Sequence, residues 1–555
     1  MLLHTRCLDC GRATAYDPAA SDCPHCGGQW RAAEYDYAAA GAKWDSALTL
    51  RPFDMWRYYE LLPVSSPDSA LRLGEGGTPL IPARNLGMML GRTSLFIKDE
   101  RQGPTGSFKD RQAALTIAAL REAGITEMVA ASTGNVAISY SAYAARAGIK
   151  LWAFVTSLVP DVKMREIALY GSQVVKVTGS YDQAKEIAAE FARQRGLFLD
   201  RGARTISSLE AMKTIAYEIA EQLGTASAAR SGSTHGARWR APDWYIQSVS
   251  GGMGPLGVFK GFEELRQMGW IEKLPAMGLI QVEGCAPMVQ SYRLGLEKAA
   301  PVDSPRTHIE TLATGDPGRA YTLLRQDVMS AGGTFESVTD EEAFRAMHTL
   351  AKMEGLSTEP AAAVAFAGLF KLVRAGLIGP DDMIVVNCTG HTMPAEETLF
   401  APHWTRDIDV AAQPAATPQE GLLAALSQVA PRRFPRVAVI DDHADARQLI
   451  RRILQAQGDY TILEAGDGPS GIELTRRERP DLVILDLMMP GMDGFQVLDA
   501  LKAEASTAGI PVIVATAKEL TAAEKARLST QIRSLMQKGD FLNDEFVEEV
   551  KSLIQ

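Results

Sequence analysis

The sequence feature that most constrains the fold is a glycine- and proline-rich turn that brings one lysine to the start of a helix. The turn, Gly-Pro-Thr-Gly-Ser-Phe-Lys-Asp-Arg, covers residues 103–111 and follows the strand-like residues 95–98. Residues 113–120 predict a helix directly after it. Open α/β sheets place ligands where a strand passes through a turn into a helix. Because the positive end of a helix lowers a lysine pKa, Lys109 is a candidate nucleophile, with an ordinary surface lysine as the alternative.

Three further turns of small residues follow predicted strands in the same way. Ser-Thr-Gly-Asn at residues 132–135 closes one strand, and Ser-Gly-Gly-Met-Gly at residues 250–254 closes the next. The second of these turns allows backbone N–H groups to close around a phosphate at a helix start. Thr-Gly-His at residues 389–391 follows a fourth strand. Each turn alone is weak evidence, so the information lies in their order along the chain.

The order of these turns resembles the fold-type II pyridoxal-phosphate (PLP) enzymes, and specifically their threonine synthase branch. Residues 74–80 (Gly-Glu-Gly-Gly-Thr-Pro-Leu), 106–110 (Gly-Ser-Phe-Lys-Asp) and 359–361 (Glu-Pro-Ala) are similar to that branch. The resemblance covers roughly residues 50–400. It implies an α/β fold with two open parallel-sheet subdomains, which agrees with the alternation of short apolar strands and amphipathic helices.

The resemblance also implies a role for each turn. Lys109 would hold the aldehyde of PLP and then move protons, while the 250–254 loop would bind the cofactor phosphate. Asn135 would face the ring hydroxyl and Thr389 the pyridine nitrogen, which tunes PLP towards elimination or replacement at Cβ or Cγ of an amino acid. The predicted cofactor-binding residues are Asn135, Ser250, Gly251, Gly252, Met253, Gly254 and Thr389, and the predicted substrate-binding residues are Ser132, Thr133 and Gly134.

One segment leaves the identity of the small amino-acid substrate open. Threonine synthases typically bind the phosphate of phosphohomoserine with an Asn-Ser…Asn-Pro-x-Arg stretch just before a Leu-Glu-Gly-Gln-Lys-Thr segment. Residues 209–214 (Leu-Glu-Ala-Met-Lys-Thr) match that segment, but residues 202–208 (Gly-Ala-Arg-Thr-Ile-Ser-Ser) lack the expected Asn, Pro and Arg. Ser207 and Ser208 could donate hydrogen bonds, and Arg204 supplies charge, although not at the matching position.

Several functions therefore stay open. The first is a threonine synthase-like lyase, with conversion of O-phosphohomoserine to threonine as one candidate reaction. The alternatives are a serine/threonine dehydratase and a cysteate-synthase-like β-replacement enzyme. The non-enzymatic alternative is a catalytically quiet amino-acid sensor or signalling scaffold. The presence of all three predicted catalytic and cofactor-ring residues, Lys109, Asn135 and Thr389, argues against it.

Two cysteine pairs lie near the N-terminus. Cys7, Cys10, Cys23 and Cys26 form the pattern CxxC…CxxC, in which each pair leads into a glycine-containing turn. Each CxxC turn, or knuckle, presents its two thiolates to one side, so two knuckles together can complete a tetrahedral metal site. A closed site of four cysteines predicts structural Zn²⁺. A redox pair and a metal-free knuckle are the alternatives. Many threonine synthase-like proteins carry a ribbon of this kind.

A second alternating pattern begins at residue 435. Two of its strands end in acids, the first in Asp441 and Asp442 and the second in Asp486. Three carboxylates at the carboxyl ends of parallel strands form an oxygen cage suited to Mg²⁺. Together with the segments at residues 511–517 and 536–538, this order resembles a response-regulator receiver domain with a flavodoxin-like fold.

The receiver resemblance implies a phosphorelay. Asp486 would accept a phosphoryl group from a sensor histidine kinase, with Mg²⁺ held by Asp486 and by the two acids of the first strand. Thr516 and Lys538 would form the switch. Two departures weaken the usual switch, because Leu535 stands where an aromatic residue is typical and Gly539 where a proline is typical.

The sequence thus predicts five regions: a zinc ribbon (1–30), an aromatic-rich arm (31–70), the PLP-dependent catalytic domain (71–402), a linker (403–434) and the receiver domain (435–555). The arm is expected to pack on the catalytic domain. Within the catalytic domain, residues 225–242 are rich in Ala, Ser, Gly and Arg and predict a surface loop.

The net charge and the cysteine usage indicate which binding partners and which cellular compartment to expect. The formal net charge of -10 argues against general nucleic-acid binding. No apolar run is long enough to span a bilayer, and residues 1–7 lack the apolar stretch of a signal peptide, so no membrane association is expected. Cys285 and Cys388 stand alone, which fits a reducing compartment. We expect a cytoplasmic homodimer.

Overall fold

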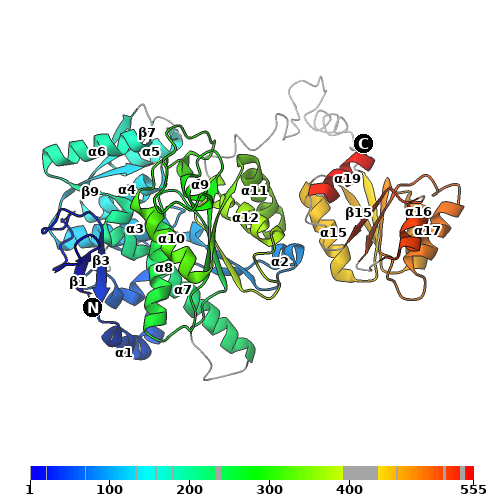
Figure 1. Ribbon diagram of the computed structural model, residues 1–555, viewed down its shortest axis with the longest axis horizontal. Helices are drawn as coiled ribbons and strands as arrows, with labels where there is room; N and C mark the ends of the chain where they lie inside the picture. The colour runs from blue at the N-terminus through cyan, green and yellow to red at the C-terminus, as the bar shows by residue number, and fades with distance from the viewer. Residues whose placement is uncertain are drawn as a thin grey trace, which may run out of the picture. The chain divides into compact units, whose positions relative to one another are not determined.

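The fold is described from a computed structural model of the chain (Figure 1). The described part of the chain divides into two compact units. The first contains the residues up to 391 except 84–92 and 352–355, and the second contains those two short segments, which include α2 (Arg84–Leu90), together with the residues from 435 onward. The structure describes residues 2–20, 22–68, 71–132, 134–156, 159, 161–177, 181–231, 239–391, 435–457, 460–516, 520–529, 531–537 and 544–554. The predicted residues Thr133 and Lys538 and the predicted linker at 403–434 lie outside these ranges.

A small antiparallel sheet forms the N-terminal ribbon. Its strands β1 (Leu2–Cys7), β2 (Ala13–Thr14) and β3 (Arg31–Tyr35) are arranged in the order β2-β1-β3. The third strand lies beyond the predicted ribbon limit at residue 30, so the sheet continues into the segment predicted as an arm. The domain limits themselves stay a prediction.

The arm that follows is built into the first unit by its aromatic residues. It contains α1 (Tyr37–Ala47) and the 3₁₀ helices η1 (Leu48–Leu50) and η2 (Met55–Leu61). Trp44 is fully buried, stacks on Trp239 with ring centroids 5.9 Å apart, and meets Tyr217 edge to face at 5.2 Å. Aromatic side chains bury large apolar areas, which explains why this segment packs tightly.

The larger sheet of the first unit has six strands, all parallel except one edge strand. The exception, β4, is antiparallel to β5 and ends in Pro82, a residue that an edge position tolerates. In spatial order the strands are β12 (Thr334–Val338), β11 (Ala276–Val282), β10 (Trp244–Ser248), β13 (Ile384–Cys388), β5 (Leu95–Asp99) and β4 (Leu80–Pro82).

A second, four-stranded sheet in the same unit is entirely parallel. Its strands, in spatial order, are β8 (Gln173–Val177), β7 (Lys150–Thr156), β6 (Glu127–Ser132) and β9 (Phe198–Asp200). Parallel strands are buried on both faces by crossover helices, which accounts for their continuous apolar sequences. The two parallel sheets confirm the predicted α/β fold class.

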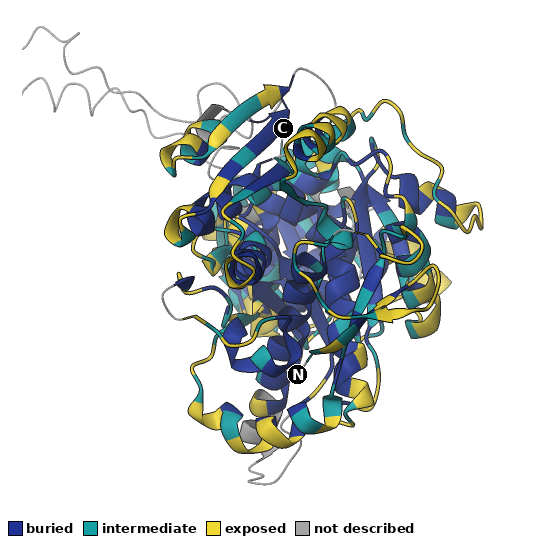
Figure 2. Ribbon diagram, turned by 90° about the vertical axis from the view of Figure 1, so that its left-hand side faces the viewer, coloured by how far each residue is buried: buried dark blue, intermediate teal, exposed yellow. Residues whose placement is uncertain are grey.

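Helices cover these sheets, as the buried interior and exposed outer surfaces in Figure 2 show. The alanine-rich α12, for example, packs against β10, β11 and β13. The helices of the first unit that follow the arm are η4 (Glu100–Gln102), α3 (Lys109–Glu122), α4 (Asn135–Ala147), α5 (Asp161–Leu169), α6 (Tyr181–Arg195), η5 (Gly202–Arg204), α7 (Ile206–Ser231), α8 (Met253–Gln267), α9 (Pro287–Arg293), η6 (Glu310–Leu312), α10 (Arg319–Ala331), α11 (Asp340–Glu354) and α12 (Pro360–Arg374).

The surface loop predicted for residues 225–242 is partly wrong. Helix α7 continues through its first seven residues and ends at Ser231. Those residues include three alanines and no glycine or proline, so high helix propensity extends the helix without an apolar repeat. Beyond the helix, Trp239 and Ala241 are buried, because their apolar side chains complete the core around the arm.

The second unit contains one parallel five-stranded sheet in the order β15-β14-β16-β17-β18. This order is that of flavodoxin-like folds, which confirms the predicted class. Its strands are β14 (Arg436–Ile440), β15 (Thr461–Ala465), β16 (Leu482–Leu485), β17 (Val512–Thr516) and β18 (Ser534–Gln537), and its helices are α15 (Ala444–Gln457), α16 (Gly468–Glu478), α17 (Gly494–Ala503), α18 (Ala522–Leu528) and α19 (Asp544–Ile554). No helix in the described ranges of either unit is both long and apolar enough to cross a membrane.

Candidate active site and metal centres

The carboxyl ends of β6, β9, β10 and β13 meet at one cavity of about 880 Å³ in the first unit. The ends of parallel strands are the usual place for a ligand in α/β sheets. Ser132 and Gly134 are not among the residues that line the cavity. The predicted residues that do line it are Lys109, Asn135, Ser250, Gly251, Gly252, Met253, Gly254 and Thr389.

The turn before Lys109 is held in place by the segment after β13. The backbone N–H of Phe108 donates to the carbonyl of Thr389 at 3.0 Å, and that of His391 donates to the carbonyl of Gly106, also at 3.0 Å. Gly106 has a φ of +77°, which L side chains rarely adopt. These two bonds place Lys109 at the first position of α3, facing the cavity.

The environment of Lys109 favours its neutral amine. The side chain is half-buried, and its Nζ lies 4.3 Å from the centroid of the Phe108 ring. Burial lowers the pKa of Lys109 to about 8, while the carboxylates of Asp200 and Glu359 oppose the shift. An appreciable fraction of this amine is therefore unprotonated near neutral pH, as a nucleophile or proton acceptor requires.

The glycine-rich loop at residues 250–254 lines the cavity beside Lys109, and close packing against neighbouring side chains requires glycine within it. Gly252 has a φ of +91° and directly precedes α8. A Cβ on Gly254 would lie 2.5 Å from Nε2 of Gln247 and 3.0 Å from the Phe108 ring, so a larger residue would not fit without movement. The first N–H groups of a helix have no intrahelical acceptor, and here they border the cavity, as a phosphate site requires.

Asn135 interacts with two residues that sequence reasoning did not assign to the site. Its Nδ2 donates to both carboxylate oxygens of Glu359, at 2.9 and 3.0 Å, and its Oδ1 accepts a hydrogen bond of 2.7 Å from Nζ of Lys163. Glu359 stands in the Glu-Pro-Ala motif, which could have indicated it. Lys163 lies on α5, where the sequence carries no local signal for it.

Ser132 has a structural partner of its own. Its buried Oγ accepts hydrogen bonds from the backbone N–H groups of Gly134 and Ala137, at 2.9 and 3.1 Å, and so caps the start of α4. Thr389 is buried, and its carbonyl supports the Lys109 turn. The roles predicted for these residues towards cofactor and substrate stay predictions.

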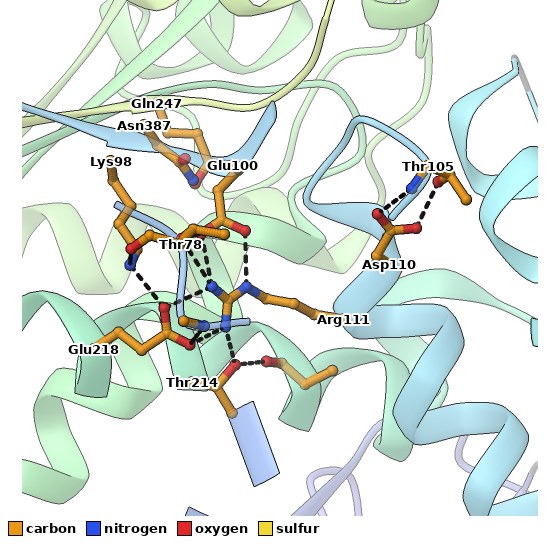
Figure 3. Close-up of polar contacts among 12 residues, drawn as sticks. Thr78, Lys98, Glu100, Thr105, Asp110, Arg111, Thr214, Glu218, Gln247 and Asn387 are labelled. Carbon is orange, nitrogen blue, oxygen red and sulfur yellow. Dashed lines mark hydrogen bonds and ion pairs between the residues drawn. The ribbon is translucent and has the colours of Figure 1, made fainter. Parts of the chain in front are cut away.

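A buried ionic network lies behind the Lys109 turn (Figure 3). Arg111 donates to Glu100 at 2.8 Å and to Glu218 at 2.6 Å, and Nζ of Lys98 lies 2.7 Å from the same Glu218 carboxylate. Although burial opposes ionisation, Arg111 and Lys98 lower the pKa of Glu218 to about 2. The network joins β5, α3 and α7, and so supports the helix that starts with Lys109.

The four ribbon cysteines converge as their spacing predicts. Their Sγ atoms all lie within 4.8 Å of one another, with Cys7 3.6 Å from Cys26 and Cys10 3.8 Å from Cys23. The backbone N–H of His25 lowers the pKa of Cys23 to about 7, whereas the neighbouring thiols raise the pKa of Cys26. Metal binding requires the thiolate form of these ligands. This closed set of four sulfur ligands fits a structural Zn²⁺.

The acids of the second unit also converge. Asp441, Asp442 and Asp486, together with His443, present ligand atoms within 4.8 Å of one another. Asp441 and Asp486 are buried, while Nδ1 of His443 lies 2.8 Å from the Asp442 carboxylate. The oxygen-rich set fits Mg²⁺, and His443 is a neighbour that the sequence pattern did not single out. The predicted switch residue Thr516 is buried at the end of β17.

PLP would fit the cavity of the first unit. That cavity contains the amine of Lys109, the glycine-rich loop at residues 250–254 and the polar side chains of Asn135 and Thr389. Residues 71–390 match the family described as pyridoxal-phosphate dependent enzyme, and residues 437–550 match the response regulator receiver domain. The chain therefore belongs to the PLP-dependent enzyme family and carries a C-terminal receiver domain.

Within that family the chain is related to threonine synthases. The threonine synthase of Methanocaldococcus jannaschii is 35% identical over 388 residues, which cover 70% of this chain and 91% of that protein. The threonine synthase of Methanosarcina acetivorans is 32% identical over 400 residues, covering 72% and 94%. Among solved structures, the processed form of threonine deaminase isoform 2 from Solanum lycopersicum is 21% identical with a TM-score of 0.48, covering 58% of this chain and 81% of that one.

Proposed function

We propose that this protein is a lyase that converts O-phosphohomoserine to threonine, by elimination and replacement at Cγ and Cβ of the amino acid. The observation that carries the proposal is the half-buried Lys109, with a pKa lowered to about 8, which shares one cavity with the glycine-rich loop at 250–254. The relation to threonine synthases over more than nine tenths of their length supports the same reaction.

The residues around the cavity would have different roles in the reaction. When bound, PLP supplies an electron sink for negative charge at the α-carbon of an amino acid. The Nζ of Lys109 would remove the proton from Cα, since its lowered pKa leaves neutral amine available. The backbone at the start of α8 would bind the cofactor phosphate, and Asn135 and Thr389 would orient its ring.

A dehydratase or β-replacement enzyme is the second candidate, because Ser207 and Ser208 are occupied by neighbours. The hydroxyl of Ser207 lies 3.0 Å from that of Thr116, and Ser208 donates to Asp200 at 2.8 Å. Both serines are buried. The expectation that they donate to a substrate phosphate is therefore not met in this arrangement, which favours a substrate without one.

For the second unit, we propose that a sensor histidine kinase is the source of a phosphoryl group transferred to Asp486. Asp441 and Asp442 would hold Mg²⁺, which offsets the repulsion between the anionic acceptor and the anionic phosphoryl group. Phosphorylation adds up to about two negative charges beside Thr516. Turnover measured with and without a phosphodonor, in wild type and in Asp486→Ala, tests whether the phosphorylated receiver regulates the lyase.

A substrate panel tests the proposed reaction. Purified holoenzyme is given phosphohomoserine, phosphoserine, serine and threonine, and the products are followed as threonine, phosphate and ammonia. Threonine and phosphate from phosphohomoserine would support the proposal, whereas ammonia from serine or threonine would favour a dehydratase. If no compound is turned over, the protein is not the enzyme proposed, and an amino-acid sensor becomes the better interpretation. Lys109→Ala is the negative control.

A further inference from the structure

The N-terminal ribbon forms part of the wall of the catalytic cavity. Gln29 and Trp30, which directly precede β3, line the cavity together with Lys109 and the 250–254 loop. Figure 1 shows the dark blue ribbon beside β9 and α10 of the same unit, and hydrogen bonds join it to both regions. The predicted zinc ribbon is therefore positioned to affect what the cavity binds.

Three arginines in the cavity wall are each bonded to a ribbon residue. Arg201, just after β9, pairs with Asp22 at 3.0 Å. Arg319, the first residue of α10, pairs with the carboxylate of Asp9 and donates to the carbonyl of Leu8 at 3.1 Å. The third, Arg204, donates from Nη1 to the side-chain oxygen of Gln29 at 2.6 Å.

These contacts differ in charge. The carboxylates of Asp22 and Asp9 neutralise Arg201 and Arg319. Gln29 is an uncharged amide, so it orients the planar guanidinium of Arg204 without neutralising it. Arg204 therefore keeps its positive charge and further N–H donors in a partly buried wall of the cavity.

Arg204 shares its cavity with Asp200 and Lys109. Burial and then the charge of Arg201 lower the pKa of Arg204, while Asp22 and Asp200 oppose the shift. The same Asp200 carboxylate acts on Lys109, so both cations lie within electrostatic range of one residue. A bound anion would pair with the charge of Arg204, which Gln29 does not neutralise.

We propose that Arg204 binds the phosphate on the side chain of the amino-acid substrate, and that Gln29 is the positioning residue that holds its guanidinium. The inference rests on the proposed function and deepens it. Arg204 takes the part of the Asn-Pro-x-Arg stretch that residues 202–208 lack, although it reaches the cavity from a different position. Through Gln29, the ribbon helps to set the specificity of the enzyme for phosphorylated substrates.

The test compares holoenzyme variants with phosphohomoserine as substrate and with serine as a ligand whose binding is followed by cofactor absorbance. Arg204→Ala should raise the KM for phosphohomoserine about 10- to 100-fold, the range for losing a hydrogen-bonded charge, with kcat and the dissociation constant for serine little changed. Gln29→Glu keeps the hydrogen bond but adds a negative charge, so it should raise the same KM about tenfold. The matched control is Arg193→Ala, which removes an exposed arginine that pairs with Glu190 on α6.

A purely structural role for Gln29 would leave the Gln29→Glu variant with wild-type KM values, and that result would overturn the positioning assignment. Wild-type KM for phosphohomoserine in Arg204→Ala would overturn the phosphate site. If Arg204→Ala does not fold, Arg204→Lys and Gln29→Glu decide in its place, because both retain a long side chain at the contact.

The two proposals can fail separately. If wild-type holoenzyme turns over no phosphorylated amino acid, the proposed function is wrong, and inorganic phosphate then serves as the probe of Arg204. Phosphate should raise the melting temperature of wild type and Arg193→Ala, but not of Arg204→Ala. An equal increase in Arg204→Ala, or none in wild type, would overturn the Arg204 site.

Discussion

Nδ2 of Asn135 donates hydrogen bonds to both carboxylate oxygens of Glu359, at 2.9 and 3.0 Å, although 224 residues separate the two in the chain. Asn135 begins the helix that follows β6, in the four-stranded sheet, whereas Glu359 precedes α12, which packs on the six-stranded sheet. Nζ of Lys163 completes the contact from α5. The pair thus connects the two sheets at the edge of the cavity that contains Lys109.

Replacing Glu359 with alanine should weaken cofactor binding. The substitution leaves Asn135 without its acceptor and Lys163 without its anion, so the dissociation constant for PLP should rise about tenfold or more. Titration of apoenzyme with PLP, followed by cofactor absorbance, measures the change. Glu190→Ala, on the exposed face of α6, is the control, and an unchanged constant in Glu359→Ala would show that the contact does not organise the site.

Lys109→Ala should abolish turnover, with a loss of about 1,000-fold or more, because the cofactor-holding amine and the proton acceptor disappear together. Borohydride reduction and peptide mapping of wild type should mark Lys109. A label on another lysine would mean that the assignment is wrong, as would activity in Lys109→Ala within about tenfold of wild type.

The lowered pKa of Lys109 also predicts a pH dependence. Reloading of apoenzyme with PLP needs the neutral amine, so the rate should rise about tenfold per pH unit below pH 8 and level off above it. An ordinary lysine would keep the rate rising to about pH 10. Stopped-flow absorbance at several pH values distinguishes the two profiles.

Glu218→Ala should destabilise the first unit strongly, by about 3–5 kcal/mol, because Arg111 and Lys98 lose their shared buried partner. Urea unfolding followed by tryptophan fluorescence measures the loss. Since the pKa of Glu218 is lowered from 4.5 to about 2, its contribution is complete above pH 4.5 and is lost as the pH falls towards 2. The control Glu190→Ala breaks an exposed pair and should leave the unfolding midpoint unchanged.

The Cys7→Ser/Cys10→Ser variant should lose one bound Zn²⁺ per chain, because two of four thiolate ligands are removed. Metal analysis of protein purified under reducing conditions measures the content. Cys285→Ser, outside the cluster, should keep its metal. A wild-type protein without metal under these conditions would contradict the zinc site.

Asp486→Ala should abolish labelling of the second unit by a small phosphodonor in the presence of Mg²⁺, since the acceptor carboxylate is gone. Asp499→Ala, on the exposed surface of α17, is the control. Label that persists in Asp486→Ala would place the acceptor elsewhere. Label on wild type without any change in turnover or in oligomer size would mean that the receiver does not regulate the lyase in this way.

The features that sequence alone predicted correctly are local ones. The fold class followed from apolar strands alternating with helices, and the cysteine cluster followed from its spacing. The strand–turn–helix order around Lys109 was also readable, because small residues and helix starts leave a local pattern. The surface loop predicted for residues 225–242 was wrong at both ends. Helix propensity extends α7 to Ser231 although no apolar repeat marks it, and Trp239 and Ala241 pack into the core.

Only the tertiary structure decided which side chains meet. The bond between Asn135 and Glu359 and the bond between Arg204 and Gln29 join segments far apart in the chain, and the lowered pKa of Lys109 arises from burial by such segments. Sequence patterns record which way a residue faces within its own element, whereas partners and desolvation depend on how elements pack. The sequence by itself therefore determined the architecture and the candidate lysine, and packing determined the charge state and the neighbours of the site.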